Sequence, residues 1–171
     1  MSTVLIIFCL VILFYLIFIY NKIIYFKNLA KQAEADIDVF LKKRHDLLGK
    51  LIDVVKGYSD FEKSTLKRIV EVRNLAFKQN VKNAGELEGE IREGIKSLFA
   101  LVENYPDLKA NENYLELQKE ITDIEEDLQK ARRFYNGVVQ SYNTFIEKFP
   151  NIIVAKVFNL KPLKYFDFKE A

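Results

Sequence analysis

The sequence predicts an all-α protein with one N-terminal transmembrane helix followed by an elongated antiparallel four-helix bundle. An apolar run fills residues 4–20, and the rest of the 171-residue chain has no second run of this kind. Six Gly and three Pro leave few helix breakers in the chain. Elsewhere apolar residues recur at intervals of three and four, the period of an amphipathic helix. These observations together favour helices over strands.

Residues 1–21 are predicted to form the transmembrane anchor. The apolar run would make about 25 Å of helix, and flanking residues add the length that a bilayer core of about 30 Å requires. A cleaved signal peptide has a basic start and a small-x-small cleavage site. No basic side chain precedes Val4 and no such motif ends the run, so an uncleaved anchor is favoured.

Charge beside the anchor predicts its orientation. Lys22, Lys27 and Lys31 follow the apolar run closely, whereas no Lys or Arg precedes it. Basic flanks are retained on the cytoplasmic side of a membrane. The N-terminus is therefore expected outside the cell and the following domain in the cytoplasm. Cys9, the one cysteine, lies in the run, so the domain is expected to have no disulfide.

Residues 22–150 are predicted to form the helical-bundle domain, whose first helix continues from the anchor to about Lys56. The apolar stripe of this helix comprises Ala33, Ile37, Leu41, Leu48, Leu51 and Val55. Their spacing is three or four except where Arg44 interrupts the stripe. Gly57 is expected to end the helix.

Two shorter helices are predicted to follow. Ser59 and Glu62 have the spacing of a capping box, from which a second helix runs to about Gln79. Its predicted inner face comprises Leu66, Ile69, Val70 and Arg73. Residues 83–86 again have the spacing of a helix cap, and a third helix is expected to reach Asn104.

The fourth predicted helix is the most regular segment of the chain. It follows a break at Pro106, runs from about Asn111 to Lys148, and ends before Pro150, because proline lacks the amide that a helix needs. Its apolar stripe comprises Leu117, Ile121, Ile124, Leu128, Ala131, Tyr135, Val138, Tyr142, Phe145 and Phe149. This sustained repeat calls for closely aligned helix partners, and short connections favour antiparallel ones.

An antiparallel pairing of the first and fourth helices predicts which charged residues meet. Arg44 is expected near Glu125 and Glu126, and Asp38 near Arg132, so that both pairings have complementary signs. In the alternative interpretation these residues are solvated charges on two exposed helix faces.

Two blocks of residues resemble a known family. The first is DIDVFLKKRHDLL at residues 36–48, and the second combines YPDLKAN at residues 105–111 with ARRFYN at residues 131–136. They resemble the LemA family, and the resemblance extends over nearly the whole chain. Gly49 departs from the family pattern, which usually has proline there, and Phe61 replaces a usual histidine.

The resemblance implies a single-pass protein of a bacterial plasma membrane with a helical bundle on the cytoplasmic side. It implies no established reaction. Genes of the family often lie beside those of membrane peptidases, which suggests a part in envelope protein quality control.

Several classes of function are disfavoured by the sequence. A formal net charge of +2 without a concentrated basic face argues against nucleic-acid binding. His45 is the only histidine, so zinc and di-iron sites lack their usual ligands, and neither a metal nor another cofactor is expected. The acidic residues at positions 86, 88, 90 and 93 are expected to form a solvated face.

One polar set next to the predicted core is the candidate interaction or register seam. Its members are Arg44, His45, Asp46, Arg132, Asn136 and Asn143. The two asparagines are seven residues apart and therefore share one flank of their helix. The seam is expected either to fix helix register through hydrogen bonds or to form a groove for a partner helix or peptide. His45 by itself is expected to be a boundary residue bonded to a neighbouring helix.

Residues 151–171 form an aromatic and basic tail. Apolar residues such as Ile153, Phe158 and Phe166 alternate with Lys156, Lys161, Lys164 and Lys169. The tail is expected to pack on the base of the bundle or to lie on the membrane surface.

The expected function is that of a non-enzymatic, membrane-tethered scaffold or adaptor. It would bind a membrane-proximal protein partner through the first and fourth helices. Two alternatives remain open: a structural protein that assembles with itself, and a ligand sensor or enzyme that uses the Arg44, His45 and Asp46 cluster.

Overall fold

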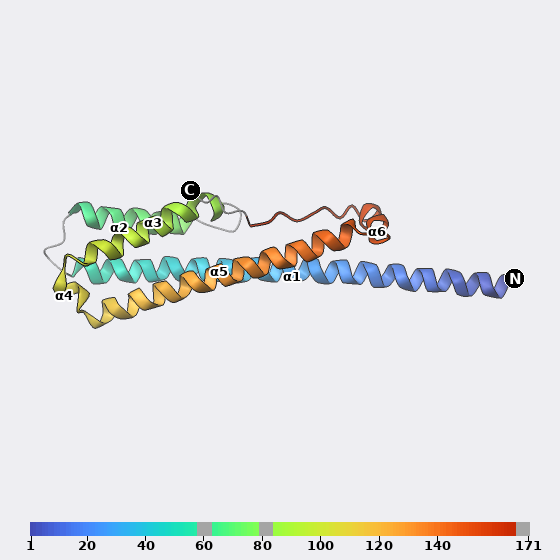
Figure 1. The fold of residues 1–171 in the computed structure, drawn as a ribbon, viewed down its shortest axis with the longest axis horizontal. Coiled ribbons are helices and arrows are strands. Elements are labelled where there is room, and N and C mark those ends of the chain that lie inside the picture. The colour runs from blue at the N-terminus through green and yellow to red at the C-terminus, as the bar shows by residue number, and fades with distance from the viewer. Residues whose placement is uncertain (58–62, 79–83, 167–171) are drawn as a thin grey trace. The chain divides into compact units, whose positions relative to one another are not determined.

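The computed structural model describes residues 1–57, 63–78 and 84–166, and the regular elements in these ranges are all helices (Figure 1). In chain order they are α1 (Ser2–Lys56), α2 (Lys63–Lys78), α3 (Ala84–Val102), α4 (Pro106–Lys109), α5 (Glu112–Glu147) and α6 (Asn151–Val157). The predictions of an all-α chain and of a long apolar N-terminal helix are confirmed. The short helices α4 and α6 were not predicted.

The chain divides into two compact units. The smaller consists of Met1–Ala33 and Arg133–Tyr165, and the larger of Glu34–Arg132 and Phe166–Ala171. The helices α1 and α5 each contribute one part to both units.

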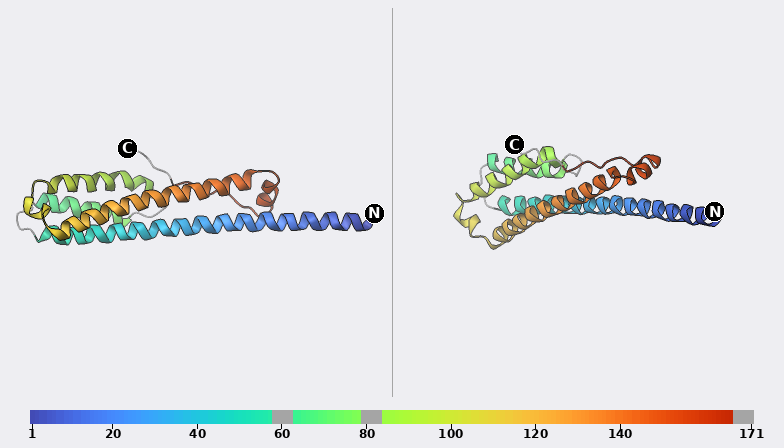
Figure 2. Two further views of the ribbon diagram at one scale, coloured as in Figure 1. Left: turned by 60° about the horizontal axis from the view of Figure 1, so that its bottom comes forward. Right: turned by 45° about the vertical axis from the view of Figure 1, so that its right-hand side comes forward.

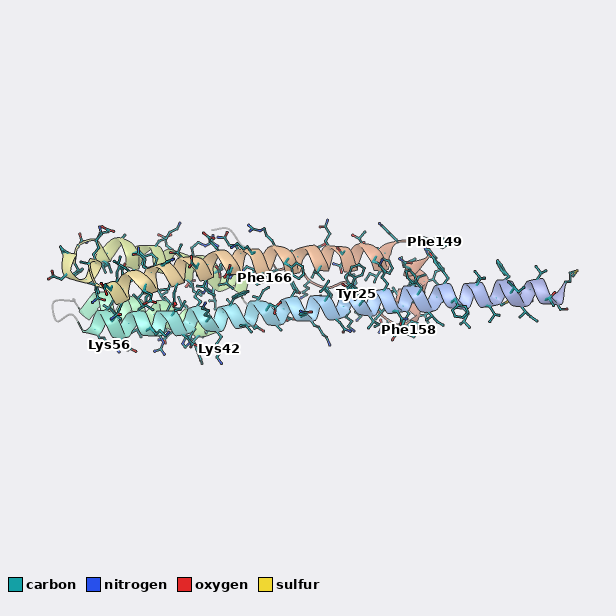
Figure 3. The ribbon with its side chains drawn as sticks, turned by 90° about the horizontal axis from the view of Figure 1, so that it is seen from below. Tyr25, Lys42, Lys56, Phe149, Phe158 and Phe166 are labelled. Atoms are coloured by element: carbon teal, nitrogen blue, oxygen red, sulfur yellow. The ribbon has the colours of Figure 1, made fainter. Side chains whose placement is uncertain are left out.

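The larger unit has one hydrophobic core, to which α1, α2, α3, α4 and α5 all contribute. Its buried members include Leu48, Leu51 and Val55 of α1, Val72 and Ala76 of α2, Ile91, Ile95 and Leu98 of α3, Leu108 of α4, and Leu117, Ile121 and Ile124 of α5. All six residues of the predicted α1 stripe are buried. Lys42 and Lys56 project from the solvent-exposed face of α1 (Figure 3).

The inner face of α2 differs from the predicted one. Val72 and Ala76 are buried, whereas Val70 and Arg73 are half-buried. Figure 2 shows α2 and α3 side by side, and they pack against each other. The predicted caps at Ser59, Glu62 and Asn83 lie outside the described residues, as do the side chains of Leu66 and Ile69.

Between α3 and α5 the predicted break contains the single turn α4. Pro106 occupies the start of this helix, where its missing amide costs nothing. Asn111 Oδ1 then accepts a hydrogen bond from the Tyr114 amide at 3.1 Å and so caps the start of α5. Burial of Tyr114, together with the nearby Glu103 carboxylate, raises the pKa of its phenol to about 12.

The predicted stripe of α5 is buried over most of its length but not at its end. Leu117, Ile121, Ile124, Leu128, Tyr135, Val138 and Tyr142 are buried, and Ala131 and Phe145 are half-buried. Phe149, which was predicted to continue the stripe, is instead 81% exposed. The reason is that α5 ends at Glu147, so the helical period no longer sets where Phe149 points.

The smaller unit has its own apolar core, to which α1, α5 and α6 contribute. Its buried members are Ile19, Ile23, Tyr142, Ile146, Val154 and Ala155. The rings of Tyr20 and Phe158 lie 4.6 Å apart between centroids. Asn151 Nδ2 donates a hydrogen bond to the Phe145 carbonyl at 2.9 Å, which ties the start of α6 to the last turn of α5. Figure 3 labels Phe149 and Phe158 at this end of α5 and α6.

Among the described residues, α1 is the one helix long and apolar enough to cross a membrane. The large apolar side chains of its first part, from Val4 to Phe18, are exposed. Exposed apolar area of this extent is typical of a segment that lies in a non-aqueous environment.

Gly94 of α3 lies directly against Val72 of α2, and replacing it with alanine is expected to destabilise the fold. The added Cβ would overlap Val72 Cγ2 and lie 3.2 Å from Val72 Cγ1. Val72 is buried and β-branched, so it cannot move aside easily. Overpacking of this kind costs about 1–3 kcal/mol, which offsets or exceeds the gain of about 1 kcal/mol in helix propensity. Urea denaturation followed by helical circular dichroism measures the change.

Gly137 of α5 provides the matched control, because a Cβ there meets nothing within 4 Å. Gly137→Ala should raise the free energy of unfolding by up to about 1 kcal/mol through helix propensity alone. Equal stabilisation by both substitutions would contradict the close approach at Gly94.

Candidate functional site

The position where arginine interrupts the α1 stripe is the centre of a buried ionic network in the larger unit. Arg44 of α1 and Arg132 of α5 are both 0% exposed, and Glu88 of α3 is 3% exposed. The carboxylate of Glu88 lies between the two guanidinium groups. Glu125 of α5 is the fourth member of this network and lies nearer to solvent.

Charge-assisted hydrogen bonds connect the network. Arg44 Nη1 donates to Glu125 Oε1 at 2.8 Å and to Glu88 Oε1 at 3.3 Å, and Arg44 Nη2 donates to Glu88 Oε2 at 3.2 Å. Arg132 Nη2 donates to the same Glu88 Oε2 at 2.6 Å. The Arg44–Glu125 pair expected from an antiparallel register is therefore present. Arg132, for which Asp38 was the expected neighbour, bonds to Glu88.

The network joins charges of both signs, and the partly exposed Arg92 of α3 also lies 3.7 Å from Glu88 Oε1. Burial acts to lower the pKa of the Arg44 guanidinium, but the carboxylates of Glu125 and Glu88 outweigh it and raise that pKa above its ordinary value. The Cζ atom of Arg132 also lies 5.0 Å from the centroid of the Phe166 ring, a cation–π contact. Each charge would be costly to bury alone, so these pairs constrain how α1, α3 and α5 align.

Glu88 was missed because it was grouped with the solvated acidic face. The helical period contained the signal that would have identified it. Glu88, Ile91, Ile95 and Leu98 are spaced by three, four and three residues, so Glu88 belongs to the buried stripe of α3. The expectation of a solvated surface is wrong for Glu88, while Glu90 and Glu93 are exposed.

His45 and Asp46 lie at the surface of the larger unit. His45 Nδ1 is 3.2 Å from Asp46 Oδ1, and the His45 ring packs against the Phe77 ring of α2 with centroids 5.1 Å apart. A pocket of about 300 Å³ adjoins them and is lined by Asp38, Leu41, Lys42, His45, Asp46, Ala76 and Phe77. Arg44 is not part of this lining.

Asn143, in the smaller unit, binds the chain's own C-terminal tail. Its Nδ2 donates to the Leu163 carbonyl at 2.9 Å, and its Oδ1 accepts from the Leu163 amide at 2.8 Å. Tyr142 and Tyr135 donate from their hydroxyls to the carbonyls of Lys161 and Lys164, at 3.2 and 3.1 Å. Burial raises the pKa of the Tyr142 phenol, so it stays a donor.

These four hydrogen bonds have one property in common: on the side of the tail they involve main-chain atoms. The six predicted seam residues are thus divided between the units. Arg44, His45, Asp46 and Arg132 belong to the larger unit, and Asn136 and Asn143 to the smaller. Asn136 is half-buried.

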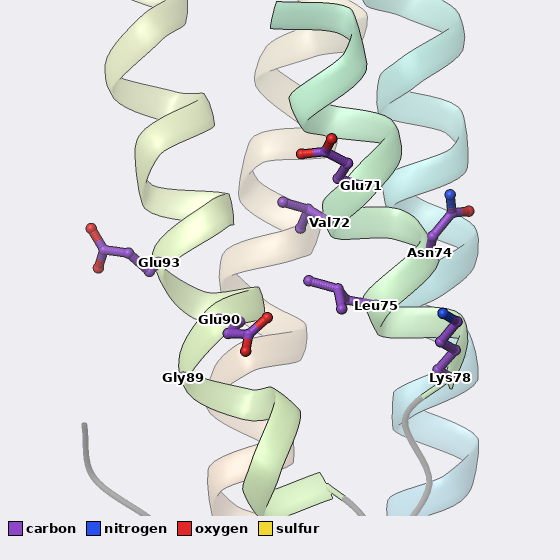
Figure 4. Close-up of a pocket in the computed structure, with 8 residues that line it drawn as sticks. All are labelled: Glu71, Val72, Asn74, Leu75, Lys78, Gly89, Glu90 and Glu93. Atoms are coloured by element: carbon purple, nitrogen blue, oxygen red, sulfur yellow. The ribbon is translucent and has the colours of Figure 1, made fainter.

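The larger unit also contains an open cleft between α2 and α3, which sequence analysis did not identify. Its volume is about 620 Å³, and it is lined by Glu71, Val72, Asn74, Leu75, Lys78, Gly89, Glu90 and Glu93. Val72 and Leu75 extend from α2 toward α3, and Glu90 extends from α3 back toward α2 (Figure 4). The lining combines an apolar floor with three carboxylates and one ammonium group.

Metal binding finds no support in these arrangements. Within residues 1–57, 63–78 and 84–166, no group of three or more His, Cys, Asp or Glu side chains is placed to hold a metal ion.

The sequence of this chain is similar to those of several known proteins. A model of the LemA family matches residues 33–171. Protein LemA of Metamycoplasma hominis is 30% identical over 162 residues, covering 92% of this chain and 74% of that protein. Magnetosome protein MamQ of Magnetospirillum gryphiswaldense is 21% identical over 179 residues, covering 89% of this chain and 66% of that protein. The long family match and the similarity to Protein LemA show that the chain belongs to the LemA family.

Proposed function

We propose that this LemA-family protein is a non-enzymatic, membrane-anchored scaffold that holds a basic helical segment of a partner protein in the cleft between α2 and α3. The observation that carries this proposal is the composition of the cleft. It lies between two helices, Val72 and Leu75 extend into it as an apolar floor, and Glu71, Glu90 and Glu93 are among the residues that line it.

These properties complement an amphipathic helix with basic flanks. Such helices bind in grooves through apolar anchors at helical spacing. Charges on the rim mainly steer the encounter and set specificity. The buried residues Arg44 and Arg132 cannot contact a partner directly, so their role in the proposal is to align the helices that form the surface.

The membrane anchor is proposed from the apolar run of α1 and the basic residues that follow it. Lys22 and Lys31 are exposed and would remain on the cytoplasmic side. The domain would then face the cytoplasm at the plasma membrane of a bacterium. An anchor confines the cleft near the membrane and so raises its effective concentration toward membrane-proximal partners.

The scaffold itself is proposed to be an antiparallel four-helix bundle made of the second part of α1, α2, α3 and the first part of α5. One shared core supports this arrangement. The Arg44–Glu125 bond supports the antiparallel register of α1 with α5.

The cleft is tested by photo-crosslinking in the native cells of this protein, with the full chain carrying the probe at Asn74. Asn74 is exposed and lines the cleft. We expect a partner to be captured from this position, and capture to be lost when Glu90 and Glu93 are both replaced by lysine. The same probe at Lys42, on the exposed face of α1, should capture none of this partner.

A charge-matched control separates the cleft from net charge. Glu112→Lys with Glu116→Lys changes the charge equally on exposed residues of α5 and should leave capture unchanged. Equal loss in both double variants would overturn the cleft as the binding site. Self-crosslinks alone would favour the alternative of a self-assembling protein.

The pocket beside His45 and Asp46 favours a second candidate, a ligand sensor. It is concave and contains ionisable groups, as ligand sites often do. This pocket is smaller than the cleft, at about 300 Å³, and Arg44 of the predicted Arg44, His45 and Asp46 cluster does not line it. The scaffold is therefore the preferred function.

A further inference from the structure

We propose that α6 is a second membrane contact, with its apolar side inserted into the lipid leaflet at the end of the span of α1. This inference rests on the proposed transmembrane anchor. It adds that the membrane holds the protein through a helix pair rather than through α1 alone.

The depth of α6 follows from its neighbours on α1. An apolar groove of about 370 Å³ is lined by Leu13, Leu16, Ile17 and Tyr20 of α1 and by Ile153, Val154, Val157 and Phe158 of α6. Leu13 precedes Tyr20 by seven residues, so the groove follows the span for about 10 Å.

The short length of the apolar run requires residues 13–20 of α1 to lie within the lipid. The whole apolar run makes about 25 Å of helix, already slightly less than the hydrocarbon core of about 30 Å. If residues 13–20 stood in water, the remaining run would be far too short to cross. Residues 13–20 therefore lie at the depth of the lipid, and α6 packs directly against them.

The side chains of α6 suit a lipid environment. Ile153 is 51% exposed, Val157 74% and Phe158 54%. Exposure of this apolar surface to water is unfavourable, and insertion into lipid would remove it from water. Lys156 is the one charged residue of α6. Its long side chain can reach the phosphate level while its methylenes remain in the apolar layer.

The backbone hydrogen bonds of α6 also suit an apolar layer, where each unpaired polar group is costly. At the start, the amides of Ile152 and Ile153 donate to the carbonyls of Lys148 and Pro150, at 2.9 and 3.0 Å. Beyond the helix end, the amides of Phe158, Asn159 and Leu160 donate to the carbonyls of Val154, Lys156 and Ala155, at 3.1, 3.2 and 2.8 Å. The turns at both ends of this short helix therefore pair these amides and carbonyls within the chain itself.

The occupant of the groove is an acyl chain of the surrounding phospholipid. The groove is continuous with the lipid-facing surface of α1, and its lining is aliphatic and aromatic. Lys22 follows the lining residue Tyr20 by two positions and Lys156 precedes Val157; both are exposed and can complement lipid phosphates.

Tryptophan quenching tests this inference, because the chain contains no tryptophan. The full-length Val157→Trp variant is reconstituted into vesicles of phosphatidylcholine and phosphatidylglycerol, with bromine atoms on the acyl chains of a fraction of the lipid. We expect blue-shifted emission and strong quenching, comparable to that of Val11→Trp in the span. Val39→Trp, on the exposed face of the larger unit, should be unquenched.

The two controls separate the possible failures. Quenching at Val11→Trp without quenching at Val157→Trp would overturn the insertion of α6 and leave the anchor intact. Absence of quenching at Val11→Trp would overturn the anchor itself. Blue-shifted but unquenched emission at Val157→Trp that depends on the protein-to-lipid ratio would mean that a second copy of the chain covers the groove, which also overturns the inference.

Discussion

Replacing Glu88 with glutamine is expected to lower the free energy of unfolding by about 3–5 kcal/mol. The substitution keeps the size of the side chain but removes the carboxylate that bonds to both Arg44 and Arg132. Both guanidinium groups are fully buried, so each loses a neutralising charge that water cannot replace. Urea denaturation of the full chain in detergent micelles, followed by helical circular dichroism, measures the loss.

Glu90→Gln is the matched control for this experiment. It lies two residues further along α3, makes the same chemical change and is exposed, so the free energy should change by less than about 0.5 kcal/mol. A loss below about 1 kcal/mol for Glu88→Gln would contradict a buried network that requires its central carboxylate.

A combined variant distinguishes the network's alignment role from its contribution to stability. Replacing Arg44, Glu88, Glu125 and Arg132 together with apolar residues of similar volume removes the charges of all four network members. Such exchanges are often neutral or stabilising. Recovery of stability without recovery of partner capture from Asn74 would show that the network positions the scaffold surface rather than simply stabilising it.

Helical periodicity predicted most of the fold, because burial in this chain follows the helix period closely. The α1 stripe and most of the α5 stripe are buried as expected, and the interruption at Arg44 is a real feature of the core. The pairing of Arg44 with Glu125 followed from simple antiparallel counting. Failures occurred where the period ends, as at Phe149, and where a charged residue occupies the stripe, as at Glu88.

The remaining features could not be read from patterns of residue type. The hydrogen bonds that join the tail to α5 use main-chain atoms of the tail, which are the same for nearly every sequence. The cleft between α2 and α3 depends on how these two helices pack, as at the close contact of Gly94 with Val72. Both are consequences of tertiary geometry, so only the participating polar side chains, such as Asn143, could be nominated in advance.

Replacing Asn143 with leucine is expected to release the tail from α5. Leucine has the same number and branching of heavy side-chain atoms but removes both hydrogen bonds to Leu163 and leaves the amide and carbonyl of that residue partly buried and unpaired. At about 1 kcal/mol for each bond, local opening of the tail should become roughly thirtyfold more frequent. Trypsin reports this opening by cleavage after Lys164, since Pro162 protects the bond after Lys161.

The control for tail release is Gln140→Leu, one turn earlier on the exposed side of α5. It makes the same amide-to-apolar change without touching the tail, so its rate of cleavage after Lys164 should match that of the unaltered chain. Faster cleavage in the Asn143 variant with unchanged global unfolding would identify a local latch, because opening of one segment need not involve the core. If cleavage after Lys164 were equally slow in both variants, the apolar contacts of Leu160 and Leu163 with the smaller core would be sufficient to hold the tail, and the paired bonds at Asn143 would contribute little.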